Sequence, residues 1–284
     1  MTRTAALPTV ATIATTALLA ACSPALTTME PARLVPAHRL QVTAGLSATN
    51  PSGDLRTAFD AASAMHVSND GLTADQVTTL MNGAAAVVVA PPSIGAEVSA
   101  TYGISRRFAV GLRTTGNTVR GNVRVQLLRI APGFYGALGV GATVYLYGFP
   151  IQQFSDQVSL TRFERQEIDV PLLFGWSGRY GHIWFGPKVV LSRYEGSVDA
   201  CVQTNGSACQ TTASVAVSGT AAYFGGQLGA AIGYGRYWFA AELTAMHVNT
   251  NAHVDLSMSG MNASVTFGAQ GLTLTPGIAF LGWF

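Results

Sequence analysis

The chain has 284 residues, of which 49% are hydrophobic and only 11% are charged, and its formal net charge is +2. Charged residues make up about a quarter of an ordinary soluble domain, so this composition argues against a soluble globular protein. The small net charge gives no reason to expect a nucleic-acid partner. The two longest stretches with almost no charge, 130–161 and 200–235, are rich in Gly, Ser and Thr and do not read as spanning helices. Since only helices and closed barrels satisfy their backbone in lipid, a β-barrel remains.

The first 22 residues carry one Arg, then an apolar core, then small residues, which is the order of a secretory signal that is excluded from the fold. The end of this stretch, Leu19-Ala20-Ala21-Cys22, resembles the lipobox of bacterial lipoproteins, in which the cysteine thiol receives a diacylglycerol. The resemblance implies a signal peptide over residues 1–21, a lipidated Cys22 and sorting to the outer membrane by the lipoprotein-sorting machinery. An ordinary signal that is cut after Ala25, with Cys22 discarded, is the alternative.

The stretch that follows, 23–38, contains three Pro residues and shows no hydrophobic period. We therefore interpret residues 22–38 as a tether between the lipid anchor and a barrel formed by residues 39–284.

Ten segments of this region have the length and the period of two that a tilted membrane strand needs. They are 39–48, 93–103, 107–115, 119–129, 134–147, 162–176, 180–194, 219–234, 236–248 and 268–284. Eight or twelve strands are the alternatives, if the first segment stays outside the wall or residues 87–92 join it.

The connections between these segments alternate in length. Residues 104–106, 130–133, 177–179 and 235 form tight turns, whereas 49–92, 148–161, 195–218 and 249–267 are long. Transmembrane barrels have short periplasmic turns and longer outer loops. An even number of strands then places both termini, and with them the lipid anchor, on the periplasmic side.

The last segment, 268–284, alternates apolar with small or polar residues and ends on Phe284. It resembles the final strand of a Gram-negative outer-membrane barrel, although Gly282 stands where that family has a large apolar residue. The resemblance implies an all-β, ten-stranded antiparallel up-and-down barrel of the small size class that includes OmpA, opacity proteins and omptins. Outer-membrane lipids and the barrel-assembly machinery are the partners it implies.

The first outer loop, 49–92, is long enough to hold structure of its own. Residues 54–65 read as a short helix, and residues 73–81 read as a second one with Thr73 as its N-cap. This loop is expected either to act as a functional lid or simply to cover the barrel mouth.

The alternation along each strand places its charged side chains on one face, and we assign that face to the lumen. The reverse orientation would place Arg side chains against lipid at a cost of about 2–4 kcal/mol each. This predicted lumen network consists of Glu97, Arg107, Arg113, Arg120, Arg124, Arg165, Glu167, Asp169, Lys188 and Glu242. Such a set suits a narrow, anion-preferring pore. It equally suits an ion-pair plug, since a barrel of this size has an interior that side chains nearly fill, and we favour the plug.

Two further groups of residues carry possible chemistry. If Cys22 is acylated, Cys201 and Cys209 remain as a pair in a polar outer loop and are expected to form a disulfide in the oxidising periplasm. No metal site is expected there, because no His lies nearby, and no cofactor is implied. His247, His253 and Asp255 lie near the outer end of one strand, as the residues of an omptin-like protease would.

Taken together, the sequence favours a non-enzymatic surface lipoprotein with a structural, adhesive or ligand-recognising role carried by its outer loops, whose ligand the sequence does not identify. A narrow small-solute channel with a charged lumen is the alternative, and a hydrolase at the outer rim is the second alternative.

Overall fold

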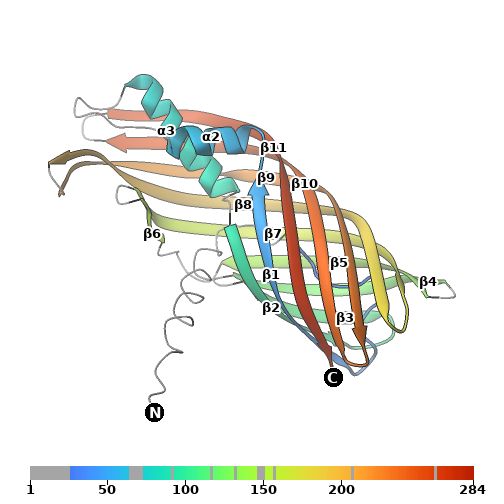
Figure 1. Ribbon diagram of the computed structural model, residues 1–284. Coiled ribbons are helices and arrows are strands. Elements are labelled where there is room, and N and C mark those ends of the chain that lie inside the picture. The colour runs from blue at the N-terminus through green and yellow to red at the C-terminus, as the bar shows by residue number, and fades with distance from the viewer. Residues whose placement is uncertain are drawn as a thin grey trace, which may run out of the picture.

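The computed structural model describes residues 26–63, 73–90, 93–115, 118–130, 133–145, 151–155, 158–205, 208–258 and 261–284. These residues form one antiparallel sheet and two helices (Figure 1). The strands of the wall are β1 (Leu40–Pro51), β2 (Ser93–Gly103), β3 (Phe108–Thr115), β4 (Thr118–Ile130), β5 (Phe134–Tyr145), β7 (Val158–Ser177), β8 (Gly181–Asn205), β9 (Ala208–Tyr234), β10 (Tyr237–Met258) and β11 (Met261–Trp283). Each pairs with its neighbour along the chain, and β5 pairs with β7. The predicted ten-stranded antiparallel up-and-down barrel is confirmed.

The last strand closes the ring against the first, as its alternation predicted. Gly45 of β1 lies opposite Ala279 of β11, and Gln41 lies opposite Trp283. The ladder is interrupted at Ala48 and Thr49, which face the region of Pro276. Proline has no N–H to donate, so a break in the sheet at this position is expected.

The two faces of the wall differ as the period of two predicted. Side chains on the outer face are large, apolar and exposed, for example Leu112 at 59%, Leu228 at 58% and Ile232 at 70%. Side chains of opposite parity point into the barrel and are buried. A contiguous apolar exterior of this extent is unusual for a soluble monomer and suits contact with lipid.

Four strands are much longer than the sequence predicts. β8, β9, β10 and β11 have 25, 27, 22 and 23 residues, about twice the 9–11 that a membrane crossing needs. The predicted loops 195–218 and 249–267 are therefore mostly paired strand. The dipeptide Asn205-Gly206 is a hairpin signal that could have revealed the first of these extensions.

The predicted loop 148–161 is also partly strand. A short β6 (Ile151–Ser155) pairs with β7 alone and lies outside the closed wall.

Two helices lie between β1 and β2, at the end of the barrel where the long hairpins project (Figure 1). They are α2 (Asp54–Ser63) and α3 (Ala74–Val89). Thr73 caps α3 through a capping box with Gln76, as expected from the sequence. α3 extends eight residues beyond its predicted end, because the Val-rich stretch before Pro91 continues the helix. No helix in the described part of the chain is long and apolar enough to cross a membrane.

We call the end of the barrel that carries α2, α3 and the long hairpins the hairpin end. The opposite one, where the tight turns 104–107 and 235–236 lie, is the short-turn end.

Candidate functional site

The lumen of the barrel is filled by residues 26–35, which we call the lumen segment. All of its residues except Arg33 are buried. At the short-turn end the N–H of His38 donates to the carbonyl of Gly103 at 2.7 Å. At the other end of the lumen segment, Leu26 packs into the apolar cluster that contains the last turn of α3. Residues 26–35 of the predicted tether 22–38 therefore lie inside the barrel, and residues 22–25 lie outside the described part of the chain.

The carboxylate of Glu242 holds the centre of the lumen segment. It accepts hydrogen bonds from the backbone N–H groups of Thr28 at 2.7 Å and Met29 at 3.0 Å, from the hydroxyl of Thr28 at 3.0 Å, and from the indole of Trp184 at 2.9 Å. Directly after these two amides the chain turns, and Met29 adopts a φ of 51°. This left-handed conformation is unfavourable for a residue with a side chain, so the carboxylate stabilises a turn that the segment would not readily adopt alone.

Two wall arginines bind the same segment on either side of this turn. Arg113 lies 2.9 Å from Glu97 and donates to the carbonyl of Thr27. Arg124 lies 3.0 Å from Glu30 and donates to the carbonyl of Pro31 at 2.6 Å. Arg124 thus finds its carboxylate partner on the segment, and Arg113, which is already paired with Glu97, gains a further acceptor there. Such partners are the condition for burying charged side chains.

Near the short-turn end the lumen segment lies close to the backbone of the wall. A Cβ on Gly103 would overlap the carbonyl oxygen of Pro36 and lie 2.6 Å from that of Val35. Gln126 adds a pair of hydrogen bonds, to the carbonyl of Ala32 at 3.2 Å and from the N–H of Leu34 at 3.0 Å. The glycine is needed here because the contact is with backbone, which cannot rotate away.

We expect Gly103→Ala to destabilise the folded barrel by about 1–3 kcal/mol, the usual cost of overpacking. Gly121→Ala is the matched control, since a Cβ there meets nothing within 4 Å. The measurement is the temperature at which each purified variant loses its fast-migrating folded band on an unheated gel. Equal midpoints for the two variants would contradict the close contact.

The C-terminal end of α3 closes the lumen from the hairpin side. Arg165 of β7 donates to the carbonyls of Val88, at 3.0 Å, and of Val89. The hydroxyl of Tyr223 donates to the carbonyl of Val89 at 2.9 Å. A cation at a helix C-terminus binds carbonyls that have no partner within the helix and complements the helix dipole. The loop helix is thus part of the lumen filling rather than a separate domain.

The structure buries nine of the ten side chains of the predicted lumen network. Arg107 is the correction: it lies exposed in the bend between β2 and β3, because β3 begins only at Phe108. Arg120 and Asp169 form a bidentate pair at 2.7 and 2.6 Å, and Lys188 donates to the carbonyl of Leu26 at 2.6 Å.

Glu30 of the lumen segment is an additional acid that sequence reasoning missed, since nothing in an aperiodic, Pro-rich stretch places it inside the barrel. With it, the described residues include five buried Arg and Lys side chains and five buried Asp and Glu side chains. The basic excess that suggested an anion-preferring pore is therefore absent from the lumen as described.

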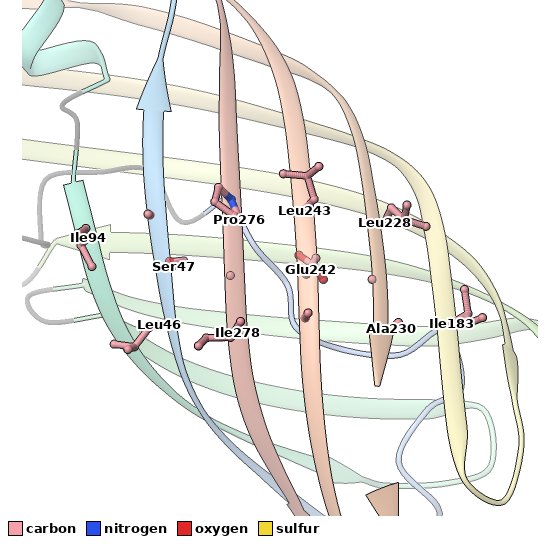
Figure 2. Close-up of a pocket in the computed structure, with 14 residues that line it drawn as sticks. Leu46, Ser47, Ile94, Ile183, Leu228, Ala230, Glu242, Leu243, Pro276 and Ile278 are labelled. Carbon is pink, nitrogen blue, oxygen red and sulfur yellow. The ribbon is translucent and has the colours of Figure 1, made fainter. Parts of the chain in front are cut away.

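On its outer face, the part of the wall that surrounds the lumen segment carries a shallow apolar groove of about 710 Å³. Figure 2 shows its side chains spread over six strands: Ile94, Leu46, Ile278, Leu243, Leu228 and Ile183. The wall beneath the groove includes Gly277, where an added Cβ would overlap the side-chain end of Met29. The groove faces outward, among side chains suited to lipid, and Met29 packs against the inner side of the wall.

Among the described rim residues, His247, His253 and Asp255 do not form a Ser-His-Asp triad. His253 Nε2 lies 3.2 Å from Asp255 and 3.1 Å from the hydroxyl of Ser264. A catalytic triad needs the two partners on different ring nitrogens, so that one orients the imidazole while the other exchanges a proton with serine. Here a single nitrogen faces both partners. His247 packs instead against Phe224, with ring centroids 4.8 Å apart.

The cysteine predictions remain predictions. Cys22 lies outside the described residues, as do the side chains of Cys201 and Cys209. The backbone of Cys201 is opposite Thr212 and that of Cys209 is opposite Thr204, in paired strands rather than in a loop. No group of three or more metal-ligating side chains occurs among the residues that the structure describes.

No protein-family profile and no curated protein matches this chain. Among solved structures it is similar to the CymD monoaromatic hydrocarbon channel, with 10% identity, 89% of this chain and 90% of that one covered, and a TM-score of 0.25. A Pseudomonas aeruginosa FadL homologue matches with 10% identity, coverage of 95% and 97%, and a TM-score of 0.26. Acinetobacter baumannii OccAB4 matches with 6% identity, coverage of 89% and 100%, and a TM-score of 0.17. Similarities this weak carry no argument about the activity of this chain.

Proposed function

We propose that this protein is a non-enzymatic barrel of the bacterial outer membrane that is closed at rest and acts at the cell surface through its long hairpins and helical cap. The export signal, the apolar exterior and the closing strand that ends near Phe284 support this location. The short turns would lie in the periplasm and the hairpins outside, as in other transmembrane barrels.

The observation that carries the proposal is the double closure of the lumen. The lumen segment fills it from the short-turn end, and α3 fills it from the hairpin end. The hairpins β8–β9 and β10–β11 extend well beyond the length that a membrane crossing needs. Most of the surface that can meet an extracellular partner is thus on these hairpins and on α2 and α3, which fits a structural, adhesive or ligand-recognising role.

Single-channel recording in planar bilayers tests this proposal. We expect the wild-type protein to be electrically silent, because bonded side chains and backbone occupy the lumen. A matched variant that lacks residues 26–35 should raise the membrane current above that of the wild type, since only α3 then blocks the path. A steady conductance from the wild-type barrel would contradict the closed state.

A gated small-solute channel is the second candidate. One observation favours it: the lumen segment is held largely by hydrogen bonds and by the ion pair of Glu30 with Arg124 rather than by a continuous apolar core. Water can replace such contacts when the segment moves. Brief wild-type openings that lengthen in Glu242→Ala would favour this candidate over a permanently closed barrel.

Lipidation of Cys22 belongs to the proposal and is supported by the lipobox resemblance. Leu26, four residues after Cys22, lies inside the lumen next to the α3 cluster and not below the short turns. The mass of the N-terminal peptide of membrane-purified protein provides the test. An unmodified peptide that begins after residue 22 would contradict lipidation.

A further inference from the structure

A second cavity, of about 510 Å³, opens at the short-turn end between the lumen segment and the wall. The lumen segment and the residues after it supply Arg33 and the stretch 34–37. The wall supplies Arg106, Gln126, Arg129 and Tyr135. Its volume is in the range of sites for small ligands, about 300–1,000 Å³.

Three guanidinium groups line this cavity, and no carboxylate does. Within the described residues none of the three forms an ion pair with an acidic side chain. The contrast with the lumen above is sharp, because Arg113, Arg120 and Arg124 each have a carboxylate within 3.0 Å. The cavity therefore has an excess of positive charge that no described acidic side chain neutralises.

The three arginines are held in different ways. The guanidinium of Arg33 lies 5.7 Å from the ring centre of Tyr135 and 6.0 Å from that of Trp283. Stacking on aromatic faces orients a guanidinium plane and leaves the N–H groups at its edge available. Arg106 and Arg129 are exposed, in the β2–β3 turn and near the end of β4. A ligand in the cavity would thus meet one guanidinium oriented by stacking and two that are exposed to solvent.

We propose that this cavity binds a phosphate-bearing anion, and that the bound anion holds the lumen segment against the wall. Guanidinium groups match phosphate oxygens in pairs of parallel hydrogen bonds. An anion bound by Arg33 of the lumen segment and by Arg106 and Arg129 of the wall joins the segment to the wall. Because binding then stabilises the inserted segment, the two equilibria are linked, and release of the anion favours departure of the segment.

The phosphate can come from a soluble compound or from the headgroup of an anionic phospholipid at the membrane surface, where basic clusters bind such headgroups. Two arms of one experiment separate these sources. The first adds inorganic pyrophosphate to the protein in a neutral detergent. The second compares nanodiscs of purely zwitterionic lipid with nanodiscs that also contain phosphatidylglycerol. A response in the first arm identifies a soluble ligand, and a response in the second arm alone identifies the headgroup.

Binding is read by calorimetry in detergent and by amide hydrogen exchange of residues 26–35 in both arms. Exchange at Leu34, whose N–H donates to Gln126, should slow when the anion is bound. We expect Arg33→Gln, Arg106→Gln and Arg129→Gln each to weaken pyrophosphate binding at least about tenfold, the usual effect of losing one charged hydrogen bond.

Arg179→Gln and Arg236→Gln are the matched controls, since both arginines lie exposed in other turns at this end, outside the cavity lining. Equal binding by the three cavity variants and the two controls would overturn the site. The absence of any response to millimolar pyrophosphate and to phosphatidylglycerol would also overturn it. Binding that leaves the exchange of residues 26–35 unchanged would overturn the link to the lumen segment. A silent or a conducting barrel is compatible with each of these outcomes, so the test is independent of the proposed function.

Discussion

Replacing Glu242 with Ala is expected to release the lumen segment from the wall. The substitution removes the shared acceptor of the Thr28 and Met29 amides, the Thr28 hydroxyl and the Trp184 indole. Hydrogen bonds to a charged group contribute about 1.5–3 kcal/mol each. Loss of the set should therefore speed amide exchange at Thr28 and Met29 by about 100-fold or more, which corresponds to roughly 3 kcal/mol in the opening equilibrium.

Hydrogen exchange followed by mass spectrometry of the peptide that covers residues 26–35 is the measurement. Glu242→Gln keeps one oxygen acceptor and should give a smaller increase. Glu195→Ala, at an exposed position of β8, is the control and should leave exchange in this peptide unchanged. If Glu242→Ala also leaves it unchanged, Glu242 is not what holds the segment.

The second large effect is expected at Arg165, which closes the other half of the lumen. Arg165→Met leaves the carbonyls of Val88 and Val89 without their charged donor. Removing one partner from a buried charged interaction typically costs about 3–5 kcal/mol. We expect α3 to separate from the wall, and amide exchange along Val77–Val89 to rise by about 100-fold or more.

Tyr223→Phe is a milder variant at the same site. It removes one neutral hydrogen bond to Val89, for which we expect about 1 kcal/mol. Arg193→Met, at an exposed position of β8, is the matched control for loss of an arginine. An effect of Arg193→Met as large as that of Arg165→Met would show that general charge loss, and not the contact with α3, is responsible.

Much of the wall could be predicted from the sequence. Alternation over 107–115 and 119–129 placed Leu112 outside and Arg113, Arg120 and Arg124 inside. The period of two of a strand assigns each side chain to one face without any knowledge of its partner. Thr73 could be identified as an N-cap for the same reason, because a capping box lies within four consecutive residues.

The strand ends were harder to predict. The hairpin extensions of β8–β11 lie beyond the apolar belt, and there the polarity of the two faces reverses: Val254 and Leu256 are buried on the inner face, whereas the outer face is polar. The predicted strand 107–115 began one residue too early, since β3 starts at Phe108. That difference was enough to place the side chain of Arg107 at the surface instead of in the lumen. Boundaries depend on where pairing with a neighbour stops, which the strand itself does not encode.

The contents of the lumen were decided by tertiary structure alone. Leu26–Val35 has no period of two or of 3.6, so no local rule predicts its conformation. It is held by acceptors and cations from β2, β3, β4 and β10, which are remote in sequence and meet only when the ring closes. Glu242 illustrates the difference. The alternation of β10 was enough to place its carboxylate inside the barrel. Its binding of Thr28 and Met29 required the whole wall, because hydrogen bonds depend on the distance and direction between parts of the chain that alternation does not relate.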